Sequence, residues 1–224
     1  MRLVLCRHGE TDYNVQRRLQ GVMNTLINKR GISQAGLISQ KLKDEKFDFI
    51  FSSPLKRCVQ TAKIIAKPHG GKIIYRDGLA EVNLGKYTGM DRHEIEVNFP
   101  GDWSRRVDSK YSFLHEAGES YREVDEKRVK PLLSEFREKY SSRSILVITH
   151  AGICRLLLGS MLGLHPQEKM EIEFPNDCIY YIDYLPHKTF VKYYLAESKK
   201  DGTGYLHRLD DGKKMEFMKF KEQA

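Results

Sequence analysis

Short apolar runs alternate along the chain with longer segments in which apolar residues recur every three or four positions. The apolar runs lie at residues 2–6, 47–53, 71–77 and 142–150. The periodic segments lie at residues 31–47, 54–68, 119–140 and 151–163. The first set predicts buried strands and the second predicts amphipathic helices. Strands that alternate with helices indicate a mostly parallel sheet with helices on both faces, so we expect a three-layer α/β/α fold.

The rest of the chain modifies this pattern in three places. Two strand-like runs, 178–184 and 189–197, are separated by "LPHK" and predict a hairpin. A less regular stretch, about residues 85–118, interrupts the alternation and includes Trp103 and Lys110, so we expect a cap-like insertion over the site. We therefore expect one domain over residues 1–197, followed by a charged C-terminal tail at 198–224. Pro131 predicts a kink in the helix at 119–140.

Composition narrows the range of partners. The chain has 224 residues and a net charge of +8, with lysine and arginine dispersed among acidic residues. This charge favours an anionic small substrate over nucleic acid, because no arginine-rich arm or known nucleic-acid motif occurs. No apolar run approaches the about 20 residues that span a bilayer, and four scattered cysteines indicate a reducing environment. We expect a cytoplasmic protein with no membrane or nucleic-acid partner.

Chemically active side chains follow the predicted strands. Arg7 and His8 end the first strand, Arg57 lies one turn into the helix after the second, Glu81 follows the third, and His150 ends the strand at 142–150. In open α/β sheets ligands bind at the carboxyl ends of the strands. Clustered cations destabilise a fold unless an anion neutralises them. The sequence therefore predicts an anion-binding site at this edge.

Three other kinds of site fit the sequence poorly. A zinc site lacks the H-E-x-x-H and P-C-x-x-C patterns, and arginines beside the histidines would repel a divalent cation. A cysteine phosphatase built on Cys6 would need an arginine at position 12, where Asp12 stands. No Walker A pattern occurs. An anion pocket around a histidine remains, and imidazole can act as a nucleophile toward phosphorus.

Four blocks carry a family resemblance. The blocks are "RHGETDYNVQRRLQG", "SSPLKRCVQTA", "LAEVNLGKYTG" and "ITHAG", in this order. Over about residues 1–185 the chain resembles the histidine phosphatase superfamily, which is also called phosphoglycerate-mutase-like. The resemblance implies the fold of that superfamily and a metal-independent, cofactor-free phosphomonoester hydrolase that acts on a small phosphorylated metabolite.

The resemblance also implies roles for five residues. His8 would be the nucleophile that carries a phosphohistidine intermediate. Arg7, Arg57 and a protonated His150 would hold the phosphoryl oxygens, and Glu81 would donate a proton to the leaving oxygen.

The substrate would be bound by further residues beside Arg7 and Arg57. These are Asn14, Gln20, Gly21, Arg105, Arg106 and Ala151. The first three lie in the first block, and the two adjacent arginines resemble a pair in phosphoglycerate mutases. No metal ligands are expected.

Two other functions stay open. A cofactor-dependent phosphoglycerate mutase is favoured by Arg105 and Arg106 and by the charged tail, which could cover the site. It is disfavoured by Leu84, because mutases carry a tyrosine three residues after the catalytic glutamate. A catalytically inactive phosphate-binding or regulatory protein is the second alternative, and it is disfavoured because every expected catalytic residue is present. A homodimer is a further expectation.

Overall fold

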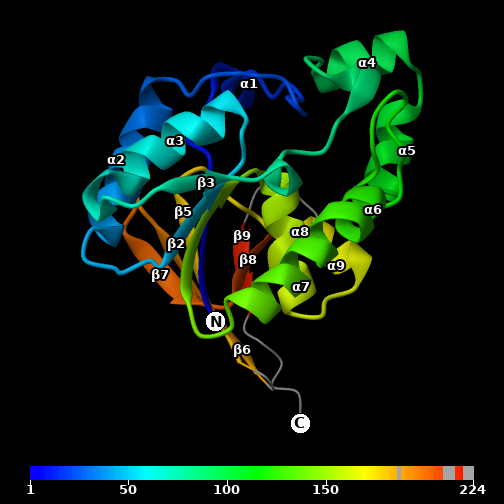
Figure 1. Cartoon of the computed structure of the whole chain (residues 1–224). Coiled ribbons are helices and arrows are strands. Elements are labelled where there is room, and N and C mark those ends of the chain that lie inside the picture. Colours follow the sequence, from blue (N-terminus) through cyan, green and yellow to red (C-terminus); the bar gives the residue numbers. More distant parts are fainter. Residues whose placement is uncertain (186–187, 209–214, 219–224) are drawn as a thin grey trace.

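A seven-stranded sheet forms the centre of the molecule (Figure 1). The computed structural model describes residues 1–185, 188–208 and 215–218. The strands of this sheet are β1 (Arg2–Arg7), β2 (Phe49–Ser52), β3 (Ile73–Tyr75), β4 (Ser144–Thr149), β5 (Cys178–Tyr184), β6 (Thr189–Leu195) and β7 (Lys200–Thr203). Their order is β3-β2-β4-β1-β5-β6-β7. The neighbouring strands β3, β2, β4 and β1 pair in parallel, whereas β5, β6 and β7 each pair antiparallel with the preceding strand in this order. The expected mostly parallel sheet is thereby confirmed.

Helices cover both faces of the sheet. The α-helices are α1 (Asp12–Val15), α2 (Lys29–Leu42), α3 (Lys56–Ala66), α4 (Arg92–Asn98), α5 (Asp102–Asp108), α6 (Tyr121–Val124), α7 (Lys130–Lys139), α8 (Ala151–Met161) and α9 (Pro166–Glu171). Short 3₁₀ turns are η1 (Lys67–His69), η2 (Asp77–Leu79) and η3 (Gly85–Tyr87), and η4 (Asp125–Val129) is a π-helix. Among the described residues, no helix combines the length and apolar character needed to cross a membrane.

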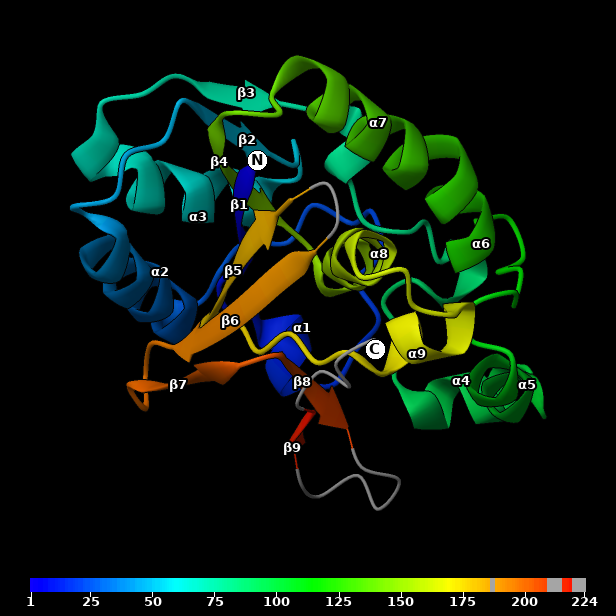
Figure 2. The same ribbon diagram turned by 90° about the horizontal axis from the view of Figure 1, so that it is seen from below.

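The alternation of side chains along β1 separates two cores. Val4 and Cys6 pack with α2 and α3 on one face, whereas Leu3 and Leu5 pack with α7, α8 and α9 on the other. All four side chains are fully buried. Figure 2 shows α2 and α3 on one side of the strands and α7 and α8 on the other. The three-layer α/β/α arrangement is thereby confirmed.

The order of the strands brings the predicted site residues together. β1 and β2 both pair in parallel with β4, so the three strands end at the same edge. In this register Arg7 lies beside Thr149, and the amide of His8 donates to the carbonyl of Thr149 at 2.9 Å. The residues that follow these strands therefore share one edge of the sheet.

The irregular stretch between β3 and α6 contains η3, α4 and α5. Figure 1 shows α4 and α5 at the end of the molecule away from the N-terminus, where β1 ends. Asp91 caps α4 in a capping box with Glu94. The carboxylate of Glu94 also accepts from Arg18 at 2.6 Å, which ties this stretch to the loop after α1.

The helix expected at residues 119–140 is not continuous. It consists of α6, the π-helical turn η4 and α7, with Pro131 in the first turn of α7. Proline has no amide hydrogen, so the regular hydrogen-bond ladder does not continue through this position. The interruption therefore lies before Pro131 and occupies a full turn rather than a simple kink.

A charged tail was expected from Ser198 onward, but residues 200–208 form strands that continue the fold. β7 extends the main sheet, and β8 (Tyr205–Arg208) pairs with β9 (Met215–Met218) in a second, two-stranded sheet. Leu206 is fully buried, and its amide donates to the hydroxyl of Tyr180 at 2.9 Å. Gly202 lies so close to the ring of Tyr193 that a Cβ would stand 2.4 Å from its hydroxyl oxygen. The segments 209–214 and 219–224 of the expected tail lie outside the described residues.

Candidate active site

His8 is buried at the end of β1 with its ring orientation and tautomer fixed. Its Nδ1 lies 2.8 Å from the carbonyl oxygen of Gly9. Because a carbonyl only accepts, Nδ1 carries the proton and Nε2 keeps a lone pair. Burial, together with the charges of Arg57 and Arg7, lowers the pKa of His8 well below its usual range. His8 is therefore a neutral imidazole with an available nucleophilic nitrogen.

Arg57 and His150 form a buried pair beneath the site. The Nε of Arg57 donates to Nδ1 of His150 at 3.2 Å, and Nε2 of His150 lies 2.8 Å from the hydroxyl of Ser53. An arginine only donates, so Nδ1 of His150 accepts and its proton resides on Nε2. Burial and the charge of Arg57 lower the pKa of His150 well below its usual range. The structure favours a neutral His150 over the expected protonated one, because Arg57 already supplies the positive charge.

The guanidinium of Arg57 is anchored by backbone carbonyls. It donates to Gly21 at 2.7 Å and to Met23 at 2.6 Å. Gly21 has a φ of +49°, a left-handed conformation that glycine adopts without steric cost. The "LQG" turn of the first block thus orients Arg57.

Arg7 is half-buried, and its buried Nε lacks a hydrogen-bond partner in the described part of the chain. One terminal nitrogen donates to the carbonyl of Phe174 at 2.8 Å, whereas its Nε has no partner among the described residues. Burial, followed by the charge of Arg155, lowers the pKa of Arg7. A buried donor without an acceptor destabilises a fold unless a ligand accepts from it. This donor fits an anion bound beside His8.

The carboxylate of Glu81 is held at the start of α8. It accepts from the amide of Val82 at 3.0 Å and from the amide of Gly152 at 3.2 Å. A Cβ at residue 152 would lie 2.4 Å from Oε1 of Glu81 and 2.7 Å from the ring of Tyr121. The glycine of "HAGI" therefore leaves the space that the carboxylate occupies.

The loop after His8 is ordered by a polar cluster. The hydroxyl of Thr11 caps α1 in a capping box with Asn14. It also donates to the side-chain oxygen of Gln20 at 3.1 Å, and Thr25 donates to the same oxygen at 2.6 Å. These bonds place Asn14 and Gln20 beside the site.

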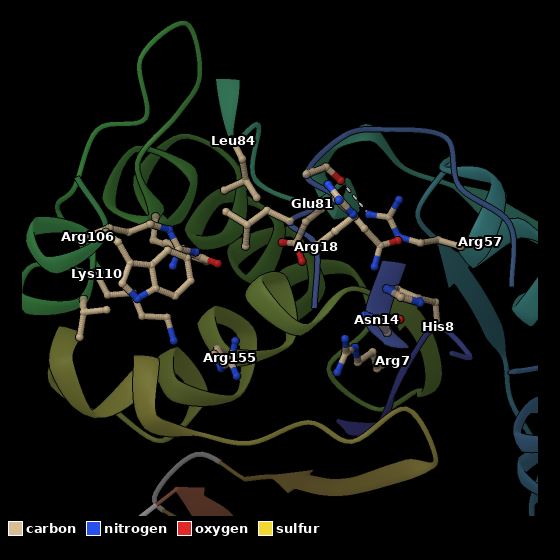
Figure 3. Close-up of a pocket in the computed structure, with 16 residues that line it drawn as sticks. Arg7, His8, Asn14, Arg18, Arg57, Glu81, Leu84, Arg106, Lys110 and Arg155 are labelled. Atoms are coloured by element: carbon tan, nitrogen blue, oxygen red, sulfur yellow. Dashed lines mark hydrogen bonds between the residues drawn. The ribbon is translucent and has the colours of Figure 1, made fainter. Parts of the chain in front are cut away.

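A cavity of about 420 Å³ opens above these groups (Figure 3). Its lining residues are Arg7, His8, Asn14, Arg18, Leu19, Gln20, Gly21, Arg57, Glu81, Leu84, Trp103, Arg106, Val107, Lys110, Tyr121 and Arg155. Five arginines and one lysine thus face a single carboxylate, which makes the cavity suited to a polyanionic ligand.

Not every expected site residue lies in this lining. Arg105 is exposed and pairs with Asp102, although it neighbours Arg106 on α5. His150 lies beneath the cavity, and Ala151 is half-buried at the start of α8 without lining it. Of the two adjacent arginines expected to bind substrate, Arg106 lines the cavity and Arg105 does not.

Three polar lining residues were not identified from the sequence, besides the apolar Leu19 and Val107. Arg18 is paired with Glu94, so it links the loop after α1 to α4. Arg155 lies on α8 one turn after Ala151, and this spacing is the signal that could have identified it. Tyr121 lies at the start of α6, and no sequence pattern marked it as a site residue.

Within the described part of the chain, no group of three or more histidine, cysteine, aspartate or glutamate side chains is placed to hold a metal ion.

Comparison with known proteins identifies the family. The family model of the histidine phosphatase superfamily (branch 1) matches residues 3–196. Phosphoserine phosphatase 1 of Hydrogenobacter thermophilus is 34% identical over 164 residues, which are 73% of this chain and 77% of that protein. A probable phosphoglycerate mutase, GpmB, of Yersinia enterocolitica is 28% identical over 90% of this chain and 93% of its own length. The α-ribazole phosphatase structure from Shigella flexneri has a TM-score of 0.79 at 24% identity, with 84% and 93% of the two chains covered. The chain therefore belongs to the histidine phosphatase superfamily, branch 1.

Proposed function

We propose that the chain hydrolyses a phosphomonoester by transferring the phosphoryl group to Nε2 of His8 and then to water. The observation that carries the proposal is the hydrogen bond from Nδ1 of His8 to the carbonyl of Gly9, which leaves Nε2 as a nucleophile among fixed cations. Family membership and the likeness to phosphatases make the chain a phosphatase of a small phosphorylated metabolite.

In the first step, Nε2 of His8 attacks phosphorus while the bond from phosphorus to the leaving oxygen breaks. Glu81, in its protonated form, gives its proton to that oxygen, so the product leaves as an alcohol. Arg7 and Arg57 stabilise the charge that spreads over the equatorial oxygens of the transition state. Their guanidinium groups are already held by Phe174, Gly21 and His150, so little reorganisation accompanies the reaction.

In the second step, water attacks the phosphohistidine. Glu81, now ionised, takes a proton from the water, and the bond between Nε2 and phosphorus breaks. Inorganic phosphate is released, and neutral His8 and protonated Glu81 are regenerated. General acid and base catalysis by one carboxylate is consistent with its position at the mouth of the anion site, where the amide of Gly152 orients it.

A phosphoglycerate mutase is the second candidate function. Arg106 lines the cavity, and a probable mutase is among the relatives. Leu84 stands where mutases carry a tyrosine, and its side chain is buried in the cavity wall. Parallel assays of phosphate release and of 3-phosphoglycerate isomerisation distinguish the phosphatase from the mutase. Isomerisation that is faster than phosphate release would overturn the proposed phosphatase function.

The remaining expectations are part of this proposal. The reaction uses no metal or cofactor, and the protein acts in the cytoplasm without a nucleic-acid or membrane partner. All four cysteines are free and buried, which supports a reducing compartment. A homodimer stays a prediction. A catalytically inactive phosphate-binding or regulatory protein would hydrolyse no phosphomonoester in these assays.

Rapid quenching with ³²P-labelled substrate tests the covalent step. Wild-type protein should retain acid-labile, base-stable label, and His8→Ala should retain none. His93→Ala is the matched control, because His93 is an exposed histidine on α4. Equal labelling of wild type and His8→Ala would remove His8 from its role. Loss of turnover with a chelator, restored by a divalent ion, would contradict the metal-free reaction.

A further inference from the structure

Three cations line the part of the cavity away from His8. Arg106 comes from α5, Lys110 follows that helix, and Arg155 comes from α8. Figure 3 shows Arg106 and Lys110 on the side of the cavity opposite His8 and Arg57, and Arg155 between them and Arg7. The two chemical steps above use none of them. We call this group of Arg106, Lys110 and Arg155 the distal site.

Arg106 is fixed in place and has no ion-pair partner among the described residues. Its Nε donates to Nε2 of His115 at 3.3 Å, and Nδ1 of His115 donates to the carbonyl of Glu119 at 2.5 Å. The guanidinium also lies 5.3 Å from the ring of Trp103. No carboxylate approaches Arg106 within 4 Å in the described part of the chain. Its terminal nitrogens thus remain available to an acceptor in the cavity.

Arg155 and Lys110 are also held by the backbone. Arg155 donates through Nε to the carbonyl of Ile172 at 2.6 Å and lies 3.4 Å from Glu173, with its side chain 13% exposed. Lys110 donates to the carbonyl of Met170 at 3.2 Å. Because the side chains are ordered before a ligand binds, binding loses little conformational entropy.

The charge at the two ends of the cavity does not fit a substrate with one phosphate. A phosphomonoester carries about two negative charges at neutral pH, which Arg7 and Arg57 match at the reactive end. Arg18 is already neutralised by Glu94. Glu173 compensates Arg155, whereas no carboxylate of the described residues lies within 4 Å of Arg106. The distal site therefore keeps a positive charge that a substrate with a neutral far end would leave unpaired.

We propose that the substrate carries a second anionic group, a phosphate or a carboxylate, which binds at the distal site. This inference rests on the proposed phosphatase function. Leu84, Trp103, Val107 and Tyr121 supply the apolar part of the lining, which suits a compact carbon framework between the two anionic groups. The substrate class is thus a small metabolite with a phosphomonoester at one end and a second anion at the other.

Substrates that differ only at the far end test this proposal. Monoalkyl phosphates of three, four and six carbons would be compared with the corresponding α,ω-diol bisphosphates and ω-phosphooxy carboxylates. Since one charge-assisted contact contributes about 1.5–3 kcal/mol, the best two-anion substrate should exceed its neutral-ended partner about 10- to 10²-fold in kcat/KM. Preference for the bisphosphate or for the carboxylate identifies the second anion.

Three variants locate the effect in the protein. Arg106→Met and Arg155→Met remove a distal charge and keep much of the side-chain volume. Each should lower the preference for the two-anion substrate about 10-fold. Arg105→Met is the matched control, because it removes the same charge from the same helix at a side chain that lies outside the cavity. The Arg105→Met variant should keep the wild-type preference for the two-anion substrate.

Binding to His8→Ala separates this inference from the proposed function. Calorimetry on that variant measures the affinity for bisphosphate and for monophosphate without turnover. Tighter binding of the bisphosphate, lost in His8→Ala with Arg106→Met, supports the distal site even if the wild type hydrolyses neither compound. Equal affinities for the two compounds would overturn the distal site, and so would an equal loss of bisphosphate affinity in His8→Ala with Arg105→Met. In either case, hydrolysis of monoalkyl phosphates by the wild type would still support the proposed function.

Discussion

The carboxylate of Glu81 and the backbone amide of Gly152 are joined by a hydrogen bond of 3.2 Å, although the two residues are 71 positions apart. Gly152 lies in the first turn of α8, which starts directly from β4. The absence of a side chain at this position lets the carboxylate approach the helix start. This contact connects the candidate proton donor to the strand end that carries His150.

Gly152→Ala should displace Glu81, because the new Cβ would lie 2.4 Å from Oε1. Loss of a positioned general acid should lower kcat for alkyl phosphates about 10²-fold or more. Steady-state kinetics with an alkyl phosphate measures this effect. Gly36→Ala is the control, because a Cβ there meets nothing within 4 Å. Similar kinetics in the two variants would show that the position of Glu81 does not limit the reaction.

Glu81→Gln should discriminate between leaving groups. An alkoxide needs a proton as it leaves, whereas a nitrophenolate does not, so phosphohistidine formation should slow about 10²–10⁴-fold for alkyl phosphates only. With p-nitrophenyl phosphate, loss of the base should slow the second step and produce a burst. Rapid-quench kinetics with both substrates gives the two rates. An equal decrease would make Glu81 a positioning residue.

Arg57→Ala should affect turnover more than ground-state binding. The guanidinium is fixed by Gly21, Met23 and His150, so it is directed at the transferring group before the reaction. Removal of one such donor lowers kcat/KM by about 10² or more. Lys56→Ala, on the exposed neighbouring residue, serves as the control. A change in KM alone would indicate uniform binding of substrate and transition state.

Asp125 should stabilise the fold where η4 contacts α8 and α9. Its carboxylate accepts from Lys169 at 2.7 Å, from Tyr111 at 2.9 Å and from Ser160 at 3.3 Å, and the ion pair is almost fully buried. Asp125→Ala leaves the Lys169 charge unpaired, so urea unfolding should show a loss of about 3–5 kcal/mol. Additional Lys169→Met should restore most of this loss.

An exposed ion pair next to Asp125 provides the comparison. Glu126 pairs with Lys130 at the surface, with about half of each side chain exposed. Glu126→Ala should therefore lower the free energy of unfolding by less than about 1 kcal/mol. If Asp125→Ala is no more destabilised than Glu126→Ala, the buried hydrogen bonds of Asp125 do not contribute to the free energy of unfolding.

The stability of the protein should fall on acidification. Burial, with a contribution from Arg106, lowers the pKa of His115 to about 4, against about 6.5 in an unfolded chain. Between these values the unfolded chain binds a proton that the folded protein does not, so the free energy of unfolding decreases as the pH falls from 7 to 5. His8 and His150 act in the same direction, because their pKa values are lowered too.

Urea unfolding at several pH values, in phosphate-free buffer, measures this slope. His115→Gln should have a shallower slope than the wild type, since glutamine does not titrate and its oxygen can accept from Arg106. Parallel pH profiles for the two proteins would show that His115 is not the titrating group.

The reactive end of the site was predictable from the sequence because it depends on local patterns. His8 and His150 each follow an apolar run, and parallel strands end at one edge of a sheet. Arg57 lies in the first turn of α3, the helix that follows the second run. Strand period, helix period and this topological rule were sufficient to place these side chains together, and the ordered blocks indicated the family.

The protonation of the buried histidines depended on contacts that no pattern contains. The sequence indicated that His150 and Arg57 share a site, and a protonated imidazole was the simple expectation. The structure directs Nε of Arg57 to Nδ1 of His150, so the same proximity keeps the imidazole neutral. Similarly, Leu206 and Gly202 belong to strands that a charged composition concealed. Only the tertiary structure shows that Leu206 is buried beside Tyr180 and that Gly202 lies against the ring of Tyr193.

The far end of the cavity was decided by tertiary structure alone. Arg105 and Arg106 are adjacent on one helix, yet the first pairs with Asp102 outside the cavity and the second lines it. Successive residues on an α-helix point about 100° apart, so the choice depends on how α5 is rotated against the rest of the protein. Arg155 reaches the same space from α8, 49 positions later. The amino-acid sequence determined which groups can react with phosphate, whereas the packing of helices distant in sequence determined which cations meet the rest of the substrate.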